Sequence, residues 1–145
     1  DLPMVRSALR RPGQFASHQA AFDFYRAKRP FRRLTDESLW DYVREGHAEQ
    51  ADGSVVLRWS GAWEACVYRS APPVIQRLRR LTLPMVGIVG ADSEVISPLS
   101  LAQWRRAQPR TAIETLPGGH LLPLENPSAC LPIIEDFLLE HDEAA

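Results

Sequence analysis

The sequence predicts an α/β fold in its second half and a mainly helical region in its first half. Residues 84–89 form an apolar run with the composition of a strand buried in a parallel sheet, and residues 111–116 are a second strand candidate that ends before Pro117. A helical pattern follows each stretch, which is the alternation that α/β proteins show. No parallel-strand pattern occurs before residue 83, so we expect a helical region over residues 1–82 and an α/β region over residues 83–145.

In the first half, three stretches have a helical pattern and one short stretch is extended. The helical stretches are residues 17–28, 36–45 and 72–81, and the extended stretch is residues 55–59. Asp36 is expected to cap the second helix, and Gly46 is expected to follow its last residue. The pair Asp52 and Gly53 predicts the turn before the extended stretch.

Most aromatic residues of the chain also lie in the first half. They are Phe15, Phe22, Phe24, Tyr25, Phe31, Trp40, Tyr42, Trp59, Trp63 and Tyr68. They predict either a packed helical core or a surface that lines a substrate pocket, and both interpretations stay open because some rings lie in polar surroundings. For the second interpretation, the candidate substrate-binding residues are Tyr25, Trp40 and Trp63.

The two helices of the second half begin at similar signals. Ser97 and Pro98 provide an N-cap and a first-turn proline for a helix that Pro109 ends. Asn126 and Pro127 repeat this arrangement for the last helix. The apolar residues of that helix recur on one face, namely Cys130, Leu131, Ile134, Phe137 and Leu138.

The loops after the two strands carry the candidate catalytic residues. The first loop contains Asp92 and Glu94, and the second contains His120 behind the glycines Gly118 and Gly119. Because the carboxyl ends of parallel strands meet at one edge of a sheet, we expect the two loops to converge. A carboxylate beside an imidazole fixes its tautomer and stabilises its protonated form, as a general base requires.

Two stretches of the second half resemble the α/β-hydrolases. LPMVGIVGADSEVISP, residues 83–98, is similar to that family's penultimate strand and acid loop. LPGGHLLPLENPSACLPIIEDFL, residues 116–138, is similar to its last strand, histidine loop and C-terminal helix. The resemblance implies that residues 83–145 form the C-terminal part of a hydrolase core, with the last two parallel strands and their flanking helices. It also implies that residues 1–82 form a helical cap.

The histidine loop supplies the most specific part of the resemblance. His120 corresponds to the family's catalytic base. Leu121, next to it, is a candidate substrate-binding residue. The resemblance gives Glu125 a structural role, in which its carboxylate holds the histidine loop to nearby backbone.

The resemblance leaves several positions for the catalytic acid. A common form of the acid loop is Gly-x-x-Asp, and Ser93 holds that position here, three residues after Gly90. A second form carries the acid one residue later, which favours Glu94. Asp92 is the rival, with an alternative role in capping the loop. In a third arrangement the acid follows the preceding strand, near Asp1.

The family's nucleophile motif, G-x-S-x-G, does not occur in the sequence, since none of the ten serines has glycines at both flanking positions. The resemblance therefore implies that the N-terminal half of the same enzyme, on the same or a separate chain, supplies the nucleophile. The predicted function is hydrolysis of an ester-like bond in an apolar small molecule. An upstream Asp nucleophile would instead give an epoxide hydrolase or a dehalogenase. A further alternative is a non-catalytic ligand-binding module or partner subunit.

Composition and cysteine content narrow the remaining possibilities. A net charge of −1 favours neither a nucleic acid nor a membrane as partner. No run approaches the roughly 20 apolar residues of a bilayer span. Neither the cysteines nor the histidines have metal-ligand spacing, so no metal or other cofactor is expected. Cys66 and Cys130 are predicted to be buried free thiols in a cytoplasmic protein, and His18 and His47 to face solvent.

Overall fold

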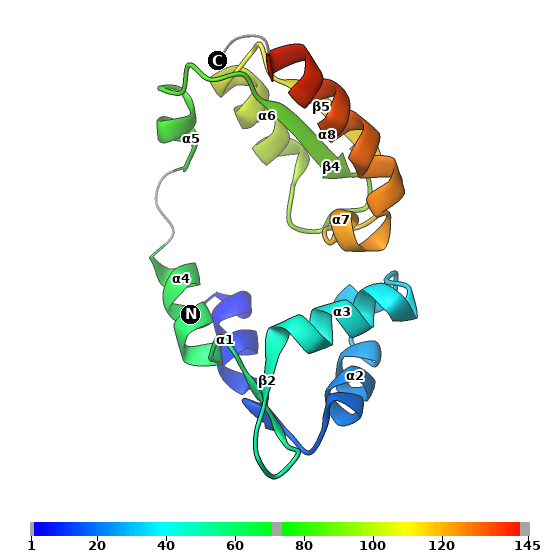
Figure 1. Cartoon of the computed structure of the whole chain (residues 1–145). Coiled ribbons are helices and arrows are strands. Elements are labelled where there is room, and N and C mark those ends of the chain that lie inside the picture. Colours follow the sequence, from blue (N-terminus) through cyan, green and yellow to red (C-terminus); the bar gives the residue numbers. More distant parts are fainter. Residues whose placement is uncertain (1, 71–73, 143–145) are drawn as a thin grey trace. The chain divides into compact units, whose positions relative to one another are not determined.

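The structure is a computed structural model that describes residues 2–70 and 74–142 (Figure 1). It divides into two compact units, residues 1–72 and residues 73–145. Within the described residues, no helix combines the length and the apolar character needed to cross a membrane. The predicted boundary after residue 82 falls inside the second unit, and the roles of cap and core stay predictions.

The first unit combines short helices with a small antiparallel sheet (Figure 1). Its elements are α1 (Pro3–Arg10), β1 (Gln14–Phe15), α2 (His18–Arg26), the 3-10 helix η1 (Arg29–Phe31), α3 (Asp36–Gly46), β2 (His47–Glu49), β3 (Val55–Leu57) and α4 (Gly61–Arg69). The strand order is β1-β3-β2, with Val56 of the central strand opposite Gln14 and Ala48. Gly53, with a φ of 81°, makes the predicted turn before β3.

Hydroxyl side chains begin three helices of this unit, because each accepts a backbone N–H bond that the first helical turn leaves unpaired. These capping residues are Ser17, Thr35 and Ser60. The prediction that Asp36 caps α3 is wrong, because the Thr35 hydroxyl takes that bond and Asp36 is the first helical residue. Gly46 is the last helical residue rather than the one after it, since His47 continues directly into β2.

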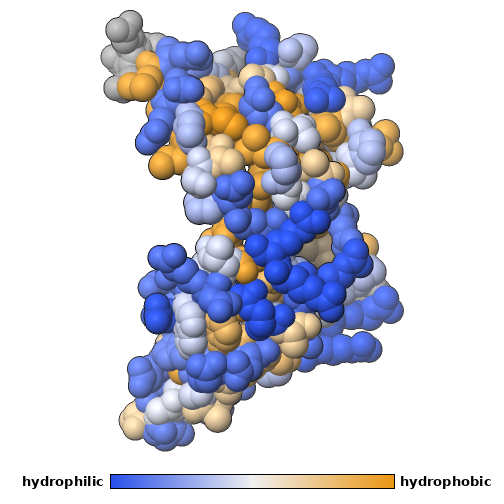
Figure 2. All heavy atoms as spheres, turned by 90° about the vertical axis from the view of Figure 1, so that its right-hand side faces the viewer, coloured by the Kyte–Doolittle hydropathy of each residue, from blue (hydrophilic) through white to orange (hydrophobic). Residues whose placement is uncertain are grey.

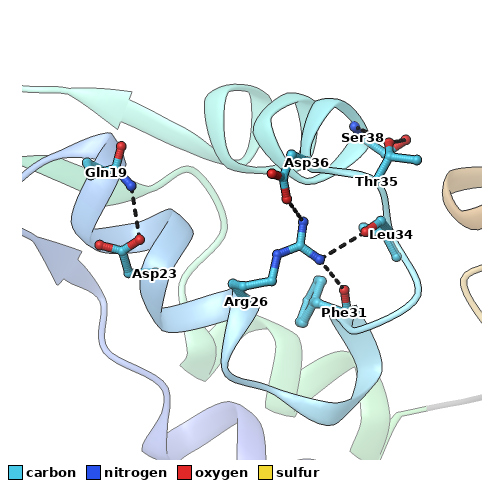
Figure 3. A network of polar contacts seen from close by, with 8 residues as sticks. All are labelled: Gln19, Asp23, Arg26, Phe31, Leu34, Thr35, Asp36 and Ser38. Atoms are coloured by element: carbon cyan, nitrogen blue, oxygen red, sulfur yellow. Dashed lines mark hydrogen bonds and ion pairs between the residues drawn. The ribbon is translucent and has the colours of Figure 1, made fainter.

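Arg26 connects the end of α2 to the start of α3 (Figure 3). Its guanidinium donates hydrogen bonds to the carbonyl oxygens of Phe31, at 3.2 Å, and Leu34, at 2.9 Å. It also pairs with the carboxylate of Asp36 at 2.6 Å. Because both carbonyls belong to the connecting segment, this one side chain fixes the course of the chain between the two helices.

Tyr25 is the centre of the aromatic core of the first unit. Its side chain is only 2% exposed. Its ring has five aromatic neighbours at centroid distances of 5.1 to 6.0 Å, namely Phe15, Phe24, Phe31, Tyr42 and His47. The packed-core interpretation of the aromatic residues is therefore confirmed for this ring.

His47 belongs to the same core, so the prediction that it faces solvent is wrong. It is 1% exposed, and its Nδ1 lies 2.8 Å from the carbonyl oxygen of Val43. Burial lowers the pKa of the His47 ring, because desolvation disfavours the imidazolium form. Its burial follows from strand pairing, which places Leu57 opposite it in the sheet. A single-sequence pattern does not show such a pairing.

The second unit contains the predicted parallel strands. Its elements are α5 (Val74–Leu78), β4 (Val86–Gly90), α6 (Pro98–Ala107), β5 (Ala112–Leu116), α7 (Leu122–Glu125) and α8 (Pro127–Asp142). β4 and β5 pair in parallel along their whole length, from Val86 opposite Ala112 to Gly90 opposite Leu116. Their carboxyl ends therefore lie side by side.

The predicted helix signals of this unit are confirmed. The Ser97 hydroxyl accepts a bond from the Ser100 N–H at the start of α6. The Asn126 side chain accepts one from the Ala129 N–H at the start of α8. The helix predicted over residues 72–81 is shorter, since α5 spans Val74–Leu78, and positions 72 and 73 lie outside the described residues.

The apolar face of α8 is largely exposed. Leu131, Ile134 and Leu138 are 53%, 41% and 59% exposed, whereas Cys130 is buried. Figure 2 shows hydrophobic side chains at the surface of this unit. The prediction of two buried thiols is correct for Cys130 and wrong for Cys66, which is exposed on α4.

Candidate active site

The loops after β4 and β5 are joined by backbone hydrogen bonds. The Ala91 N–H donates to the carbonyl oxygen of Leu116 at 2.8 Å, and the Asp92 N–H donates to that of Gly118 at 2.9 Å. These bonds continue the parallel pairing beyond the ends of the strands. The expected convergence of the two loops is therefore confirmed.

Glycines allow this close approach. A Cβ atom on Gly90 would lie 2.0 Å from the carbonyl oxygen of Gly119 and 2.7 Å from that of Gly118. Gly118 has a φ of 148°, a conformation that residues with a Cβ rarely adopt. Gly118 therefore provides a backbone turn that suits glycine, and Gly90 provides the space in which the histidine loop lies against β4. A Cβ on Gly119 would instead meet the Glu125 carboxylate, at 2.6 Å.

Glu125 holds the histidine loop from the other side. Its carboxylate accepts a hydrogen bond from the Gly119 N–H at 2.6 Å. Glu125 is the last residue of the short helix α7, so the loop is tied to the element that follows it. The structural role that the resemblance gives to Glu125 is confirmed by this bond.

His120 turns its ring toward the acid loop. Its Nδ1 lies 3.3 Å from the Oγ of Ser93, which also accepts a bond from the Ile96 N–H at 3.2 Å. The contact with His120 is at the long end of the hydrogen-bond range. If Nδ1 carries the proton and donates it to Oγ, the other ring nitrogen, Nε2, keeps a lone pair for use as a base. The ring itself is exposed.

Ser93 is the residue of the acid loop that the structure places against His120, and a search for carboxylates does not select it. Asp92 and Glu94 flank it in the same loop, with exposed side chains. The signal for Ser93 is its position, three residues after Gly90, where the resemblance leads us to expect an aspartate. Which carboxylate serves His120 stays a prediction, and the third candidate position, Asp1, lies outside the described residues.

The candidate substrate-binding residues differ in their surroundings. Tyr25 is buried in the core of the first unit. Trp40, on α3, is half-buried and stacks on Phe22 with 4.5 Å between ring centroids. Trp63, on α4, is 52% exposed. Leu121 is half-buried and lies beside His120 in the second unit.

Trp63 offers a test that separates substrate binding from core packing. Trp63→Ala is expected to lower the free energy of unfolding by less than about 1 kcal/mol, because the ring is largely exposed and its aromatic neighbour Trp59, 4.8 Å away between ring centroids, is exposed as well. If Trp63 contacts substrate, KM rises while kcat stays near its original value. Urea unfolding and steady-state kinetics measure the two effects.

Trp40→Ala is the matched comparison. It removes a half-buried ring stacked on Phe22, so it is expected to destabilise the protein by about 1 to 2 kcal/mol. A loss of stability in Trp63→Ala as large as that in Trp40→Ala, with KM unchanged, would assign Trp63 to the packed core instead.

Comparison with known proteins identifies the fold. No protein-family model matches the chain, and no curated protein sequence matches it significantly. Among solved structures, E-2-(acetamidomethylene)succinate hydrolase is 21% identical, with a TM-score of 0.77 over 93% of this chain and 52% of that chain. A peroxisomal α/β-hydrolase from Saccharomyces cerevisiae is 20% identical, with a TM-score of 0.76 over 97% of this chain and 40% of that chain.

A third similar structure is an esterase from M. tuberculosis. It is 20% identical, with a TM-score of 0.73 over 93% of this chain and 46% of that chain. The chain thus spans about half the length of these solved structures. Its parallel strand pair and histidine loop are consistent with the C-terminal portion of such a protein. The chain therefore has the fold of the α/β-hydrolase superfamily.

Proposed function

We propose that this chain forms the C-terminal portion of a hydrolase and supplies the base and the acid of a nucleophile-His-acid triad. The observation that carries the proposal is the contact between His120 Nδ1 and Ser93 Oγ at 3.3 Å. It orients the one histidine of the strand-end loops toward the loop that also contains two carboxylates. The name esterase of one similar structure supports an ester-like bond as the one hydrolysed.

In this proposal, His120 moves protons through Nε2. The ring takes the proton of the attacking nucleophile and then gives it to the leaving group. Between these steps it is an imidazolium, which a carboxylate at the Nδ1 side stabilises. Glu94 is the proposed acid, with Asp92 as the rival. Ser93 holds the ring in the tautomer that leaves Nε2 free.

The nucleophile and the oxyanion hole are proposed to come from an N-terminal portion, on the same chain or on a partner chain. The proposed substrate is an apolar small molecule bound with the help of the first unit. An Asp nucleophile in that portion would make the enzyme an epoxide hydrolase or a dehalogenase. If that N-terminal portion contains no nucleophile, the assembled protein is a ligand-binding module.

The two carboxylates are distinguished by matched substitutions in the assembled enzyme. Glu94→Gln is expected to lower kcat for 4-nitrophenyl esters by about a hundredfold or more, because the amide holds the ring but does not stabilise the imidazolium. Asp92→Asn is expected to lower kcat by less than about fivefold. The kcat of Ser93→Ala should lie between the values of the other two variants, since this substitution removes one contact that orients the His120 ring. Stopped-flow release of 4-nitrophenolate measures all three.

If Asp92→Asn lowers kcat more than Glu94→Gln does, the acid is Asp92 and the hydrolase proposal still holds. If both carboxylate substitutions lower kcat only slightly and to the same extent, the catalytic acid does not come from this loop. If the assembled protein hydrolyses no ester, assays with an epoxide and a haloalkane distinguish the two other reaction classes. Binding without turnover of any of these compounds would support the ligand-binding module.

A further inference from the structure

The first unit contains a cavity of about 660 Å³. Residues of α1, α2, η1 and α4 line it, so it lies wholly within this unit. Its volume is in the range of small-molecule sites, which are about 300 to 1,000 Å³. The size of the cavity alone does not identify a ligand, but the chemistry of its walls does.

The walls carry an excess of positive charge. Among the residues that the structure describes, four basic side chains line the cavity, those of Arg6, Arg10, Arg11 and Lys28, against a single carboxylate, that of Glu64. The carboxylate is already engaged, since it pairs with Arg11 and accepts a hydrogen bond from the Tyr68 hydroxyl at 2.8 Å.

The other basic side chains of the cavity are not paired with carboxylates among the described residues. Among the described residues, Arg6 and Arg10 form no ion pair. The Lys28 ammonium group lies over the Phe24 ring, 4.4 Å from its centroid, and not against a carboxylate. Like charges that gather around a cavity raise the local concentration of anions and favour their binding. The cavity is therefore suited to a negatively charged group.

Tyr25 also belongs to the wall of this cavity. It is 2% exposed, and within the described part of the chain its hydroxyl has no hydrogen-bond partner and almost no accessible surface. Neighbouring atoms therefore cover this hydroxyl, and it does not open onto the cavity. Burial raises the pKa of Tyr25 to about 12, because desolvation disfavours the phenolate form.

Aromatic and aliphatic side chains form much of the remaining cavity wall. Phe24, Phe31 and Tyr68 contribute rings, and Met4 and Pro30 contribute aliphatic surface. Rings of this kind bind planar apolar groups through their faces and edges. The cavity thus joins an apolar surface to basic groups.

We propose that this cavity binds a small organic acid, a carboxylate carried on a planar apolar body. Arg6 and Arg10 contact the carboxylate, and the aromatic side chains hold the body. This adds an acid group to the apolar ligand proposed above. It rests on the proposed function only for what happens to the ligand after binding.

Isothermal titration calorimetry with three probes tests the proposal on the whole protein. Cinnamate has both features, cinnamamide lacks the charge, and inorganic phosphate lacks the apolar body. We expect saturable binding of cinnamate, with cinnamamide and phosphate at least about tenfold weaker. Equal affinity for cinnamate and cinnamamide would overturn the anion site. Phosphate binding as tight as that of cinnamate would overturn the apolar half of the proposal, and absence of cinnamate binding would overturn all of it.

Matched variants locate the binding. Arg6→Gln and Arg10→Gln are each expected to weaken cinnamate binding by about tenfold, because each removes one partner of the carboxylate. The controls are Arg32→Gln and Arg58→Gln, which make the same chemical change at residues of this unit that do not line the cavity. Circular dichroism checks that each variant folds. Equal losses in the variants and their controls would contradict the proposed location.

The binding test is independent of the hydrolase proposal. His120→Ala is expected to retain cinnamate binding, since His120 does not line this cavity. Ligand binding without ester hydrolysis would contradict the proposed function alone. Ester hydrolysis without binding of any of the probes would contradict the anion site alone.

Discussion

Replacement of His120 with alanine is expected to lower kcat of the assembled enzyme by about a thousandfold or more. The substitution leaves no group to take the nucleophile's proton and none to return it to the leaving group. His120 is exposed, so its loss should change the free energy of unfolding by less than about 0.5 kcal/mol. Single-turnover kinetics and urea unfolding separate the two effects.

His141→Ala is the matched control for this prediction. His141 also lies in the second unit, where its Nδ1 is 2.8 Å from the carbonyl oxygen of Phe137 within α8. We expect turnover close to the original value after its replacement. Partial rescue of His120→Ala by added imidazole would further support a proton-transfer role. A loss of less than about tenfold, without rescue, would contradict the role of His120 as general base.

Replacement of Gly90 with alanine is expected to destabilise the second unit by about 2 to 3 kcal/mol. The added Cβ would lie 2.0 Å from the carbonyl oxygen of Gly119. Strand pairing fixes Gly90, and the hydrogen bond from the Gly119 N–H to Glu125 holds the histidine loop. Relief of this overlap requires the histidine loop to move away from β4. Turnover should therefore fall together with stability, because His120 follows Gly119 directly.

Gly46→Ala is the control for the glycine substitution. A Cβ at Gly46 would meet no atom within 4 Å, and the residue ends helix α3. The change is expected to be neutral or stabilising by up to about 1 kcal/mol, because alanine favours the helix more than glycine does. Urea unfolding and the kinetics of 4-nitrophenyl ester hydrolysis measure both variants. If Gly90→Ala proves as harmless as Gly46→Ala, the close contact between the two loops is absent in solution.

Local signals in the sequence determined most of the second unit. Strand β4 follows from an apolar run and β5 from a strand candidate that ends before Pro117, and both are found within one or two residues of the predicted bounds. Helices α6 and α8 follow from Ser97 and Asn126, whose side chains pair with N–H groups a few residues away. Such features are predictable because their stabilising partners lie close by in the sequence.

The structure of the first unit was less predictable, because contacts between residues far apart in the sequence stabilise its elements. Its strands are two or three residues long, too short for a periodic pattern, and they exist through pairing between β1, β2 and β3. Helices α1 and α4 were not predicted, and they pack on each other around Val5 and Ala65. The cavity of this unit depends on the same packing.

The sequence by itself determined that His120 lies in a loop at the end of a parallel strand and that a carboxylate-bearing loop lies next to it. Only the tertiary structure decided which atom stands against the ring, namely Ser93 Oγ at 3.3 Å from Nδ1. It likewise decided that His47 is buried and that Cys66 is exposed. The physical reason is the same in each case: burial and side-chain contact depend on which distant segments pack together, and one sequence does not specify that packing through local pattern.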